Sequence, residues 1–468
     1  MSGSLLVVAA ALAMGACSRG SVAPLDAGAT DAATSGDAST MILPPFVQRL
    51  TNSADPSATA PQVNLTQWNW DRQIAVGDDG GVHVVWARLG TANIDLPADR
   101  ADPVDPTQLP TGQIFYKRSS DGGRTWSAGF ALTGPTNGID SATVATSGAY
   151  VYVMWRAAEA GRLRAFVRSS SDGGLSWGAP VAVSDNPASV SVSAPALAGD
   201  GSAPSAKLYA VWADGRSQSV GGQPVSVKEI YLAKSSDHGA SFGAASAVSV
   251  PDGFSSWTPA LAIWSQTIHV AWTDERDDLA ECTKGANSCH EEEYYRRSLD
   301  DGATWEAEQR LTFDPPGAPT ESWAPSMAVW QDSVHIAYLD KRSGYFQIYY
   351  RRSTTGGASF GPEALIAADA MFMNAARPTI AAREGDVHLT WFGFSTFEAD
   401  IYYSRSMDDG VSWSPFLDLT AGSDAVGAAR VPHIAVAPDH AAHIIWYDTR
   451  FSDANGPRIE LFYARPNG

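Results

Sequence analysis

Arginine, tryptophan and acidic side chains that directly precede short apolar segments are the best candidates for chemistry in this 468-residue chain. A guanidinium group binds a carboxylate through two parallel hydrogen bonds, and an indole offers an apolar face to a sugar ring. Together they would suit an acidic sugar, with Asp71, Asp140 and Glu321 as candidate catalytic acids. The alternative is that these side chains only pack between neighbouring structural units. The candidate ligand-binding residues of this kind are Arg72, Arg377, Arg430, Trp70, Trp257 and Trp323.

A second set of polar residues directly follows apolar segments that end in Trp or Tyr. In four places this set has the form Asp-x-Arg. Four copies favour a turn-capping ion pair, because a residue needed once for catalysis need not recur in four places. Two phenylalanines, Phe392 and Phe394, and long loops at 88–112 and 277–293 replace the pattern elsewhere, and we expect them to shape a binding site. The copies are Asp214/Arg216, Asp274/Arg276, Asp340/Arg342 and Asp448/Arg450.

The loop at 277–293 is acidic and contains two cysteines. We expect Cys282 and Cys289 to form a disulfide in an oxidising compartment; free thiols are the alternative, and a zinc site is a weaker one. The acids could bind calcium, although a solvated charged loop is the simpler expectation. No other cofactor is expected. The acids are Asp277, Asp278, Glu281, Glu291, Glu292 and Glu293.

Histidine repeats in a way that excludes a shared metal site. Five histidines stand three residues before the aromatic end of an apolar segment, each in a different repeat, so they cannot converge on one ion. No metal site, nucleophile elbow, phosphate-binding loop or dinucleotide fingerprint is expected. The histidines are His83, His269, His335, His388 and His443.

Seven short segments rich in β-branched and aromatic residues supply the elements that position these candidates. They are residues 82–86, 151–155, 208–212, 268–272, 334–338, 387–391 and 443–446, each ending in Trp or Tyr. A shorter apolar segment precedes each, and an Ile/Tyr-rich segment such as 114–116 or 348–350 follows. The pattern predicts an all-β chain in which one four-stranded unit repeats.

The third segment of most repeats is followed by a turn of the form S-x-D-x-G-x-[TS]-[WF]. Its carboxylate accepts turn N–H groups, its Gly can take positive φ, and its aromatic residue packs under the hairpin. We therefore expect these turns to be structural rather than catalytic. A sixth turn, at 353–360, has Thr355 in place of Asp. The five intact copies contain Asp121, Asp172, Asp237, Asp300 and Asp408.

These turns resemble the Asp-boxes, or BNR repeats, of bacterial sialidases and related β-propellers. The resemblance covers the repeat unit and implies one propeller domain at 42–468. We predict seven blades, because the last repeat lacks an outer strand that residues 46–51 can supply from the N-terminus. Known sialidase catalytic domains have six blades, which is the alternative.

In the sialidases an arginine triad holds the substrate carboxylate, a Tyr with a Glu partner is the nucleophile, and an Asp is the acid/base. Arg72, Arg377 and Arg430 form the best triad here, and no Tyr can be singled out. The family's Arg-Ile-Pro-like motif is matched at Arg72 without its Pro, and better at Arg430, which lies in the last repeat. We therefore expect a propeller that binds glycans or proteins at its channel mouth without catalysis; the alternative is an exo-sialidase-type glycoside hydrolase acting on extracellular glycans.

The N-terminus predicts export and anchoring. Residues 1–17 have an apolar run that ends in a sequence resembling the lipobox of bacterial lipoproteins, with Cys17 as the lipidated residue; a plain cleaved signal is the alternative. Residues 18–41 lack apolar periodicity and are expected to be a tether. We expect a monomer lipid-anchored in the cell envelope, in the outer membrane. The net charge of −19 argues against binding nucleic acid.

Overall fold

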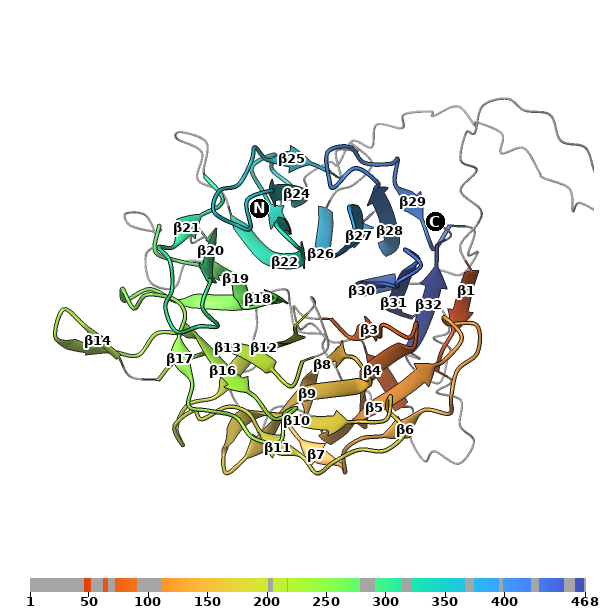
Figure 1. Cartoon of the computed structure of the whole chain (residues 1–468), viewed down its shortest axis with the longest axis horizontal. Helices are drawn as coiled ribbons and strands as arrows, with labels where there is room; N and C mark the ends of the chain where they lie inside the picture. The colour runs from red at the N-terminus through yellow and green to blue at the C-terminus, as the bar shows by residue number, and fades with distance from the viewer. Residues whose placement is uncertain are drawn as a thin grey trace, which may run out of the picture. The chain divides into compact units, whose positions relative to one another are not determined.

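Seven sheets of four or more strands stand around a central channel as the blades of a propeller (Figure 1). The predicted all-β fold and the count of seven blades are confirmed, and the six-blade alternative is wrong. No helix in the described part of the chain is long and apolar enough to cross a membrane. The computed structural model describes residues 46–51, 62–65, 72–90, 111–200, 205–216, 218–277, 291–313, 321–366, 374–394, 399–421, 429–449 and 459–466.

Each blade has four antiparallel strands, from an inner strand at the channel to an outer strand. The inner strands are β3 (Ile74–Val76), β8 (Asp140–Ser147), β12 (Val192–Gly199), β18 (Ser256–Trp264), β22 (Ser322–Trp330), β26 (Asn374–Arg383) and β30 (Ala429–Val436). The second strands are β4 (Val82–Gly90), β9 (Tyr150–Glu159), β13 (Leu208–Asp214), β19 (Thr267–Asp274), β23 (Ser333–Asp340), β27 (Asp386–Phe394) and β31 (Ala442–Asp448).

The outer half of each blade completes the sheet. The third strands are β5 (Thr111–Ser119), β10 (Arg162–Ser170), β16 (Glu229–Ser235), β20 (Glu292–Ser298), β24 (Gln347–Ser353), β28 (Ala399–Ser406) and β32 (Glu460–Arg465). The outer strands are β6 (Phe130–Ala131), β11 (Val181–Ala182), β17 (Ser246–Ala247), β21 (Gln309–Arg310), β25 (Ala364–Leu365), β29 (Leu417–Asp418) and β1 (Phe46–Arg49). Blade 1 also carries β2 (Gln62–Leu65) and β7 (Thr136–Asn137), and β14 (Gln218–Val220) pairs with β15 (Gln223–Val225).

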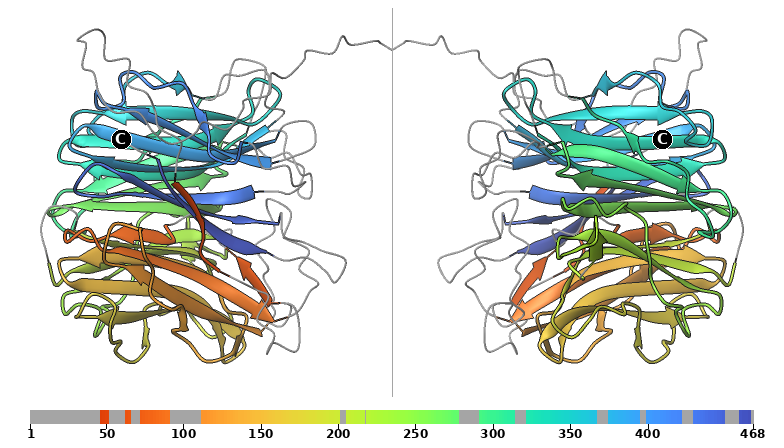
Figure 2. Two further views of the ribbon diagram at one scale, coloured as in Figure 1. Left: turned by 90° about the vertical axis from the view of Figure 1, so that its right-hand side faces the viewer. Right: turned by 90° about the vertical axis from the view of Figure 1, so that its left-hand side faces the viewer.

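The core lies between blades, so the second strands are buried on both faces. Their aromatic ends fill the space between sheets, and Trp86, Trp212, Trp272, Trp391 and Trp446 are at most 1% exposed. A strand covered on both faces needs no apolar–polar alternation, which explains continuous runs such as residues 82–86. Seen from the side, the sheets of neighbouring blades lie one above another (Figure 2).

Strand β1 closes the ring as the outer strand of the seventh blade. It pairs antiparallel with β32, and Arg49 and Thr51 bind Glu460 at 2.6 and 2.5 Å. In blade 4, Arg310 and Thr312 bind Glu292 in the same way. The Arg-Leu-Thr sequences at 49–51 and 310–312 therefore have the same structural role although they lie at distant points of the chain.

The Asp-box turns join the third strand of a blade to its outer strand, and their carboxylates bind within the turn. Asp300 accepts hydrogen bonds from Ser298 Oγ at 2.8 Å, Thr304 N at 2.8 Å and Thr304 Oγ1 at 2.6 Å. The hydroxyl of Thr304 and the other donors lower the pKa of Asp300 to about 2. In the sixth turn Thr355 Oγ1 accepts from Ser359 N at 3.2 Å, so a hydroxyl takes part of the carboxylate's role.

The same turns also fix each blade to the preceding one. A Cβ added at Gly357 would lie 1.8 Å from the hydroxyl oxygen of Tyr295, and Gly123, Gly174 and Gly410 meet the equivalent tyrosines at 1.8 to 1.9 Å. Tyr295 in turn binds His269 Nδ1 at 2.6 Å, and burial lowers the pKa of His269 to about 3. The repeated histidines thus serve as neutral partners of a tyrosine on the third strand of their own blade. His83, His335, His388 and His443 make the same contact.

The inner strands share an irregularity near their N-terminal ends. Six of them contain a β-bulge, with a register shift against the second strand and one non-glycine residue of positive φ. Because the irregularity recurs in six blades, it belongs to the scaffold rather than to one site. The positive-φ residues are Ser141, Ala194, Thr258, Ala324, Arg377 and Val431.

The acidic segment before β20 differs from the expectation of a solvated loop. Glu291, Glu292 and Glu293 are all buried, and the last two belong to β20 itself. The expected loop at 277–293 therefore ends earlier than its composition suggested. Hydrogen bonds to the outer strand and the ladder of β19 and β20 outweigh the polar character of these residues.

Candidate functional site

The residue directly before each bulge stands on one rim of the channel, which we call the entry rim. In six blades this position holds Asp140, Ser193, Trp257, Trp323, Ala376 and Arg430. Because antiparallel strands alternate in direction, the ends of the second strands and the loops that follow them lie on the same rim. The structure thus brings most of the predicted candidates to one face of the ring.

Asp140 is held by a neighbouring arginine. Arg156 Nε and Nη2 donate to its two carboxylate oxygens at 2.7 and 2.6 Å, and Arg156 Nη1 donates to Val192 O at 3.1 Å. The side chains of Arg156 and Asp140 are 4% and 16% exposed. This two-point ion pair lies within blade 2, and the bond from Arg156 to Val192 O links it to blade 3, so both carboxylate oxygens of Asp140 are already bound.

Arg72 reaches across the channel rather than toward a ligand at the entry rim. Its Nη2 donates to the carbonyl oxygens of Met327 at 2.8 Å and Ile380 at 3.2 Å, on the inner strands of blades 5 and 6. Its own carbonyl accepts from Val144 N and Thr143 Oγ1 in blade 2. Arg72 therefore ties four blades together at the axis.

Arg377 and Arg430 each contact an aromatic ring of the preceding blade. The Arg377 guanidinium lies 5.9 Å from the Trp323 ring centroid, and that of Arg430 lies 5.3 Å from Phe394. Arg377 and Trp323 are buried, whereas Arg430, Phe394 and Trp257 are half-buried. Packing between blades, the alternative raised by the sequence, accounts for the buried pair, and the half-buried residues form the accessible part of the entry rim.

The remaining predicted residues divide into buried and undescribed ones. Phe392 is 1% exposed and belongs to the core between blades 6 and 7, and Glu321 is 9% exposed with its carbonyl bound to Lys341 N. The other predicted residues lie outside the described part of the chain, so their roles stay predictions: Cys17, Trp70, Asp71, Asp278, Glu281, Cys282, Cys289 and Arg450.

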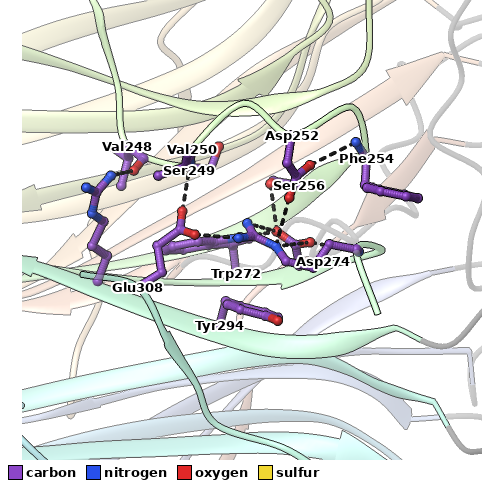
Figure 3. A network of polar contacts seen from close by, with 12 residues as sticks. Val248, Ser249, Val250, Asp252, Phe254, Ser256, Trp272, Asp274, Tyr294 and Glu308 are labelled. Atoms are coloured by element: carbon purple, nitrogen blue, oxygen red, sulfur yellow. Dashed lines mark hydrogen bonds and ion pairs between the residues drawn. The ribbon is translucent and has the colours of Figure 1, made fainter. Parts of the chain in front are cut away.

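The Asp-x-Arg repeats form ion pairs at the ends of the second strands. In blade 4, Arg276 Nε and Nη2 donate to Asp274 at 2.8 and 2.7 Å, and the guanidinium lies 4.4 Å over the Tyr294 ring. Asp274 also accepts from Ser256 Oγ at 2.9 Å and Trp272 Nε1 at 2.8 Å; Figure 3 shows Asp274 and Ser256 together, with Glu308 further along the network. Asp214/Arg216 and Asp340/Arg342 pair in the same way.

One acid on this side of the ring breaks the repeat. Glu293 stands opposite Thr273, where the third strands of neighbouring blades place Ile230 and Ile348. It is fully buried, its Oε1 accepts from Thr273 Oγ1 at 3.2 Å, and its Oε2 has no hydrogen-bond partner among the described residues. Burial and the nearby acids raise the pKa of Glu293 well above its usual value.

Glu229, in blade 3, also has a pKa raised by burial, but its position holds an equivalent acid in blade 4. It stands opposite Asp214, as Glu292 stands opposite Asp274, and Ser249 Oγ donates to it at 2.5 Å. Burial raises the pKa of Glu229 to about 7. Within the described ranges, no three His, Cys, Asp or Glu side chains are arranged to hold a metal ion.

Glu293 is the residue that the composition-based interpretation of the acidic segment missed. A signal was present: aligned on the aromatic end of the second strand, the third strand of blade 4 reads Glu-Tyr-Tyr where blades 5 and 6 read Ile-Tyr-Tyr. The acids that precede Glu293 hid this signal, because composition assigns the whole acidic run to a loop.

Comparison with known proteins found similar solved structures at low sequence identity. No family model and no curated protein sequence matches this chain. Similar solved structures include a protein of unknown function from Dyadobacter fermentans, with 15% identity, a TM-score of 0.45, and coverage of 75% of this chain and 95% of that one. A K499G mutant of NanB sialidase from Streptococcus pneumoniae has 10% identity and a TM-score of 0.45, with coverage of 90% and 94%.

A third similar structure is the GH93 α-L-arabinofuranosidase of Fusarium graminearum in complex with arabinobiose. Its identity is 13% and its TM-score 0.43, with coverage of 68% of this chain and 89% of that one. At such values none of these likenesses assigns an activity to this chain.

Proposed function

We propose that this chain is a cell-envelope propeller that binds a glycan at its entry rim without cleaving it. The observation that carries the proposal is the state of the residues that catalysis would need. Asp140 is held in a two-point ion pair with Arg156, and Arg72 is bound to main-chain carbonyls across the channel. The half-buried Trp257, Arg430 and Phe394 remain available on the same rim.

The chemistry of these three side chains suits a sugar. Indole and phenyl faces pack against the C–H face of a sugar ring, and a guanidinium donates to hydroxyl or carboxylate oxygens. An acidic sugar would be repelled at long range by the net charge of −19, so a local arginine would be needed to hold it. A surface protein is the other partner class that such a rim could bind.

Glycan binding can be tested with the full chain and its variants Trp257→Ala and Arg430→Ala. We expect calorimetry against sialyllactose and neutral oligosaccharides to show binding that each variant weakens by about tenfold, or 1.4 kcal/mol. Leu175→Ala, at a side chain that is 65% exposed far from this rim, is the control for nonspecific loss. Binding of a surface protein but of no sugar would contradict the proposal.

A glycoside hydrolase is the second candidate, for which Glu293 would have to become accessible, since it is fully buried here. A general acid must keep its proton near the working pH, and burial raises the pKa of Glu293 in that direction. The test is release of 4-methylumbelliferone from its sialoside and from other glycosides. Turnover that is lost in Arg430→Ala and in Glu293→Gln, while circular dichroism shows both variants folded, would establish a hydrolase and overturn a binding-only role.

The cellular setting of the proposal depends on the N-terminal sequence alone. Lipidation at Cys17 would anchor the propeller in the cell envelope, with residues 18–41 as the tether. Metabolic labelling with palmitate is expected to mark the wild-type chain and not Cys17→Ser. A labelled Cys17→Ser chain would exclude this anchor.

A further inference from the structure

The channel holds a cavity of about 320 Å³ at the end away from the entry rim. It is lined by the last residues of the inner strands and by the hairpins that lead into the second strands, and Arg72 is among its lining residues. Its size lies at the lower end of the range for small-molecule sites. Because it opens opposite the entry rim, it is separate from the surface proposed above.

One position of the repeat gives this cavity its chemical character. It is the residue at the start of the hairpin between the inner and second strands. Three consecutive blades, 4 to 6, place large side chains there: Trp264, Trp330 and Arg383. The other four blades place Gly77, Ser147, Asp200 and Ala437 there. The wall of the cavity is therefore aromatic and cationic on one side only.

The three large side chains form a continuous surface. The ring centroids of Trp264 and Trp330 are 4.7 Å apart with their planes inclined at 55°, and the Arg383 guanidinium lies 5.0 Å from the Trp330 centroid. All three residues are half-buried, and all three line the cavity. Ser265 N donates to Asp200 Oδ1 at 2.8 Å, which fixes the hairpin that carries Trp264 to the neighbouring blade.

The fold does not require tryptophan at this position. Blades 1, 2, 3 and 7 form the same hairpins with small residues or aspartate, so the hairpin itself does not need a large side chain at this position. Large aromatic faces that remain accessible in a cavity gain free energy when a ligand covers them. The two indoles are therefore better explained by a ligand than by the needs of the scaffold.

The lining chemistry selects a saccharide. Two inclined indole faces offer an apolar surface to the C–H face of a sugar ring, and Arg383 adds hydrogen-bond donors at its edge. Asp78, an exposed carboxylate on the blade 1 side, adds an acceptor for hydroxyl groups. A flat aromatic ligand would stack on one indole but would leave this mixed polar rim unused.

We propose that this cavity is a second carbohydrate site, in which a sugar ring stacks on the Trp264–Trp330 pair at the end of the channel opposite the entry rim. The site is independent of the proposed function, because it shares no residue with Trp257, Arg430 and Phe394. A glycan bound here would occupy the axis of the ring on the same face as the Asp-box turns.

The test is calorimetry and tryptophan fluorescence of the full chain with chitohexaose, cellohexaose, maltohexaose and sialyllactose. We expect at least one of these probes to bind, and Trp264→Ala and Trp330→Ala each to lower its affinity by about tenfold. Leu175→Ala, at a side chain that is 65% exposed, is expected to leave that affinity unchanged. Arg383→Met is expected to weaken binding by less, because it keeps the apolar stem and removes only the donors.

Two results would overturn this proposal. One is the absence of binding by every probe; the other is binding that Trp257→Ala abolishes while Trp264→Ala and Trp330→Ala leave it intact, which would support the entry rim alone. Circular dichroism shows whether the alanine variants fold. If they do not, Trp264→Phe and Trp330→Phe replace them. An affinity for all probes that is unchanged in these smaller-ring variants would count against stacking.

Discussion

The Asp-box turns and the two ends of the channel are parts of the same repeat, yet they differ in how strictly the repeat is kept. The turns hold the same carboxylate, hydroxyl and glycine in five blades, because each turn satisfies its own backbone and its glycine packs closely on side chains of the propeller, a tyrosine of the preceding blade in three of the five. At the channel ends, equivalent positions hold Trp, Arg, Asp, Ser, Ala or Gly. Residues that the fold requires recur from blade to blade. Positions whose residue differs between blades are available for binding a ligand.

The largest effect is expected at the glycine of an Asp-box turn. Gly357→Ala would place a Cβ 1.8 Å from the hydroxyl oxygen of the buried Tyr295 at a φ of +83°, so we expect the free energy of unfolding to fall by about 3 kcal/mol or more. Denaturant titration measures the change. Gly302→Ala meets Ile268 only at 3.2 Å, and we expect it to cost about 1 kcal/mol.

Gly221→Ala is the control for backbone strain alone, because its φ is +58° and no atom lies within 4 Å of the added Cβ. If Gly357→Ala cost no more than Gly221→Ala, the contact with Tyr295 would not join the blades as described. That outcome would remove the physical reason for the repetition of these turns.

A smaller and pH-dependent effect is expected at Glu293, where the repeat is broken. Burial raises its pKa in the folded chain, so the unfolded chain releases the proton first as pH rises above about 4.3. The wild type should therefore lose stability relative to Glu293→Gln as pH increases from 5 to 8. Glu293→Ile, which restores the residue of the neighbouring blades, should stabilise the chain by about 1 kcal/mol or more at pH 8.

Thermal unfolding across this pH range checks the prediction. Stability curves of wild type and Glu293→Gln that run parallel from pH 5 to 8 would show that Glu293 titrates normally and is not buried as the structure describes. A hydrolytic role would then lose its supporting observation.

The smallest effect is expected from one Asp-box carboxylate, because Asp300 is exposed and the turn repeats in other blades. Hydrogen bonds from Thr304 and Ser298 lower its folded pKa to about 2, so its contribution is present above the unfolded pKa near 4 and is lost as pH falls toward 2. Asp300→Asn should lower the melting temperature at pH 6, and the difference from wild type should shrink between pH 4 and 2. A difference that stays constant over this range would mean that the charge of Asp300 has no role in the turn.

The sequence predicted the fold in detail because its signals are local and repeated. The aromatic ends of the second strands, the turns such as 298–305 and the outer strand at 46–49 each follow from short-range patterns, and seven copies reinforce one another. The His–Tyr pairs between the second and third strands were not predicted as contacts, although the histidine position itself was visible as a repeat.

The candidate site was predicted less well, because its members come from different blades. The sequence placed Trp257, Arg430 and Arg377 at the correct end of their strands, but burial separates Arg377 from the other two. Arg72 looked like a carboxylate ligand by residue type, and the width of the channel decides instead that it bonds to Met327 and Ile380. The cavity with Trp264 and Trp330 was not singled out, because a tryptophan next to a hairpin carries no sign of what faces it.

By itself, the sequence determined the all-β class, the seven-fold repeat, the closing strand and the turn chemistry, since strand periodicity and turn geometry depend on residues close together in the chain. Only the tertiary structure decided which side chains meet at the channel, because that depends on the radius of the closed ring and on the packing of each blade against the next. The burial of Glu293 and the paired indoles of Trp264 and Trp330 are of this second kind, set by residues that lie tens to hundreds of positions apart.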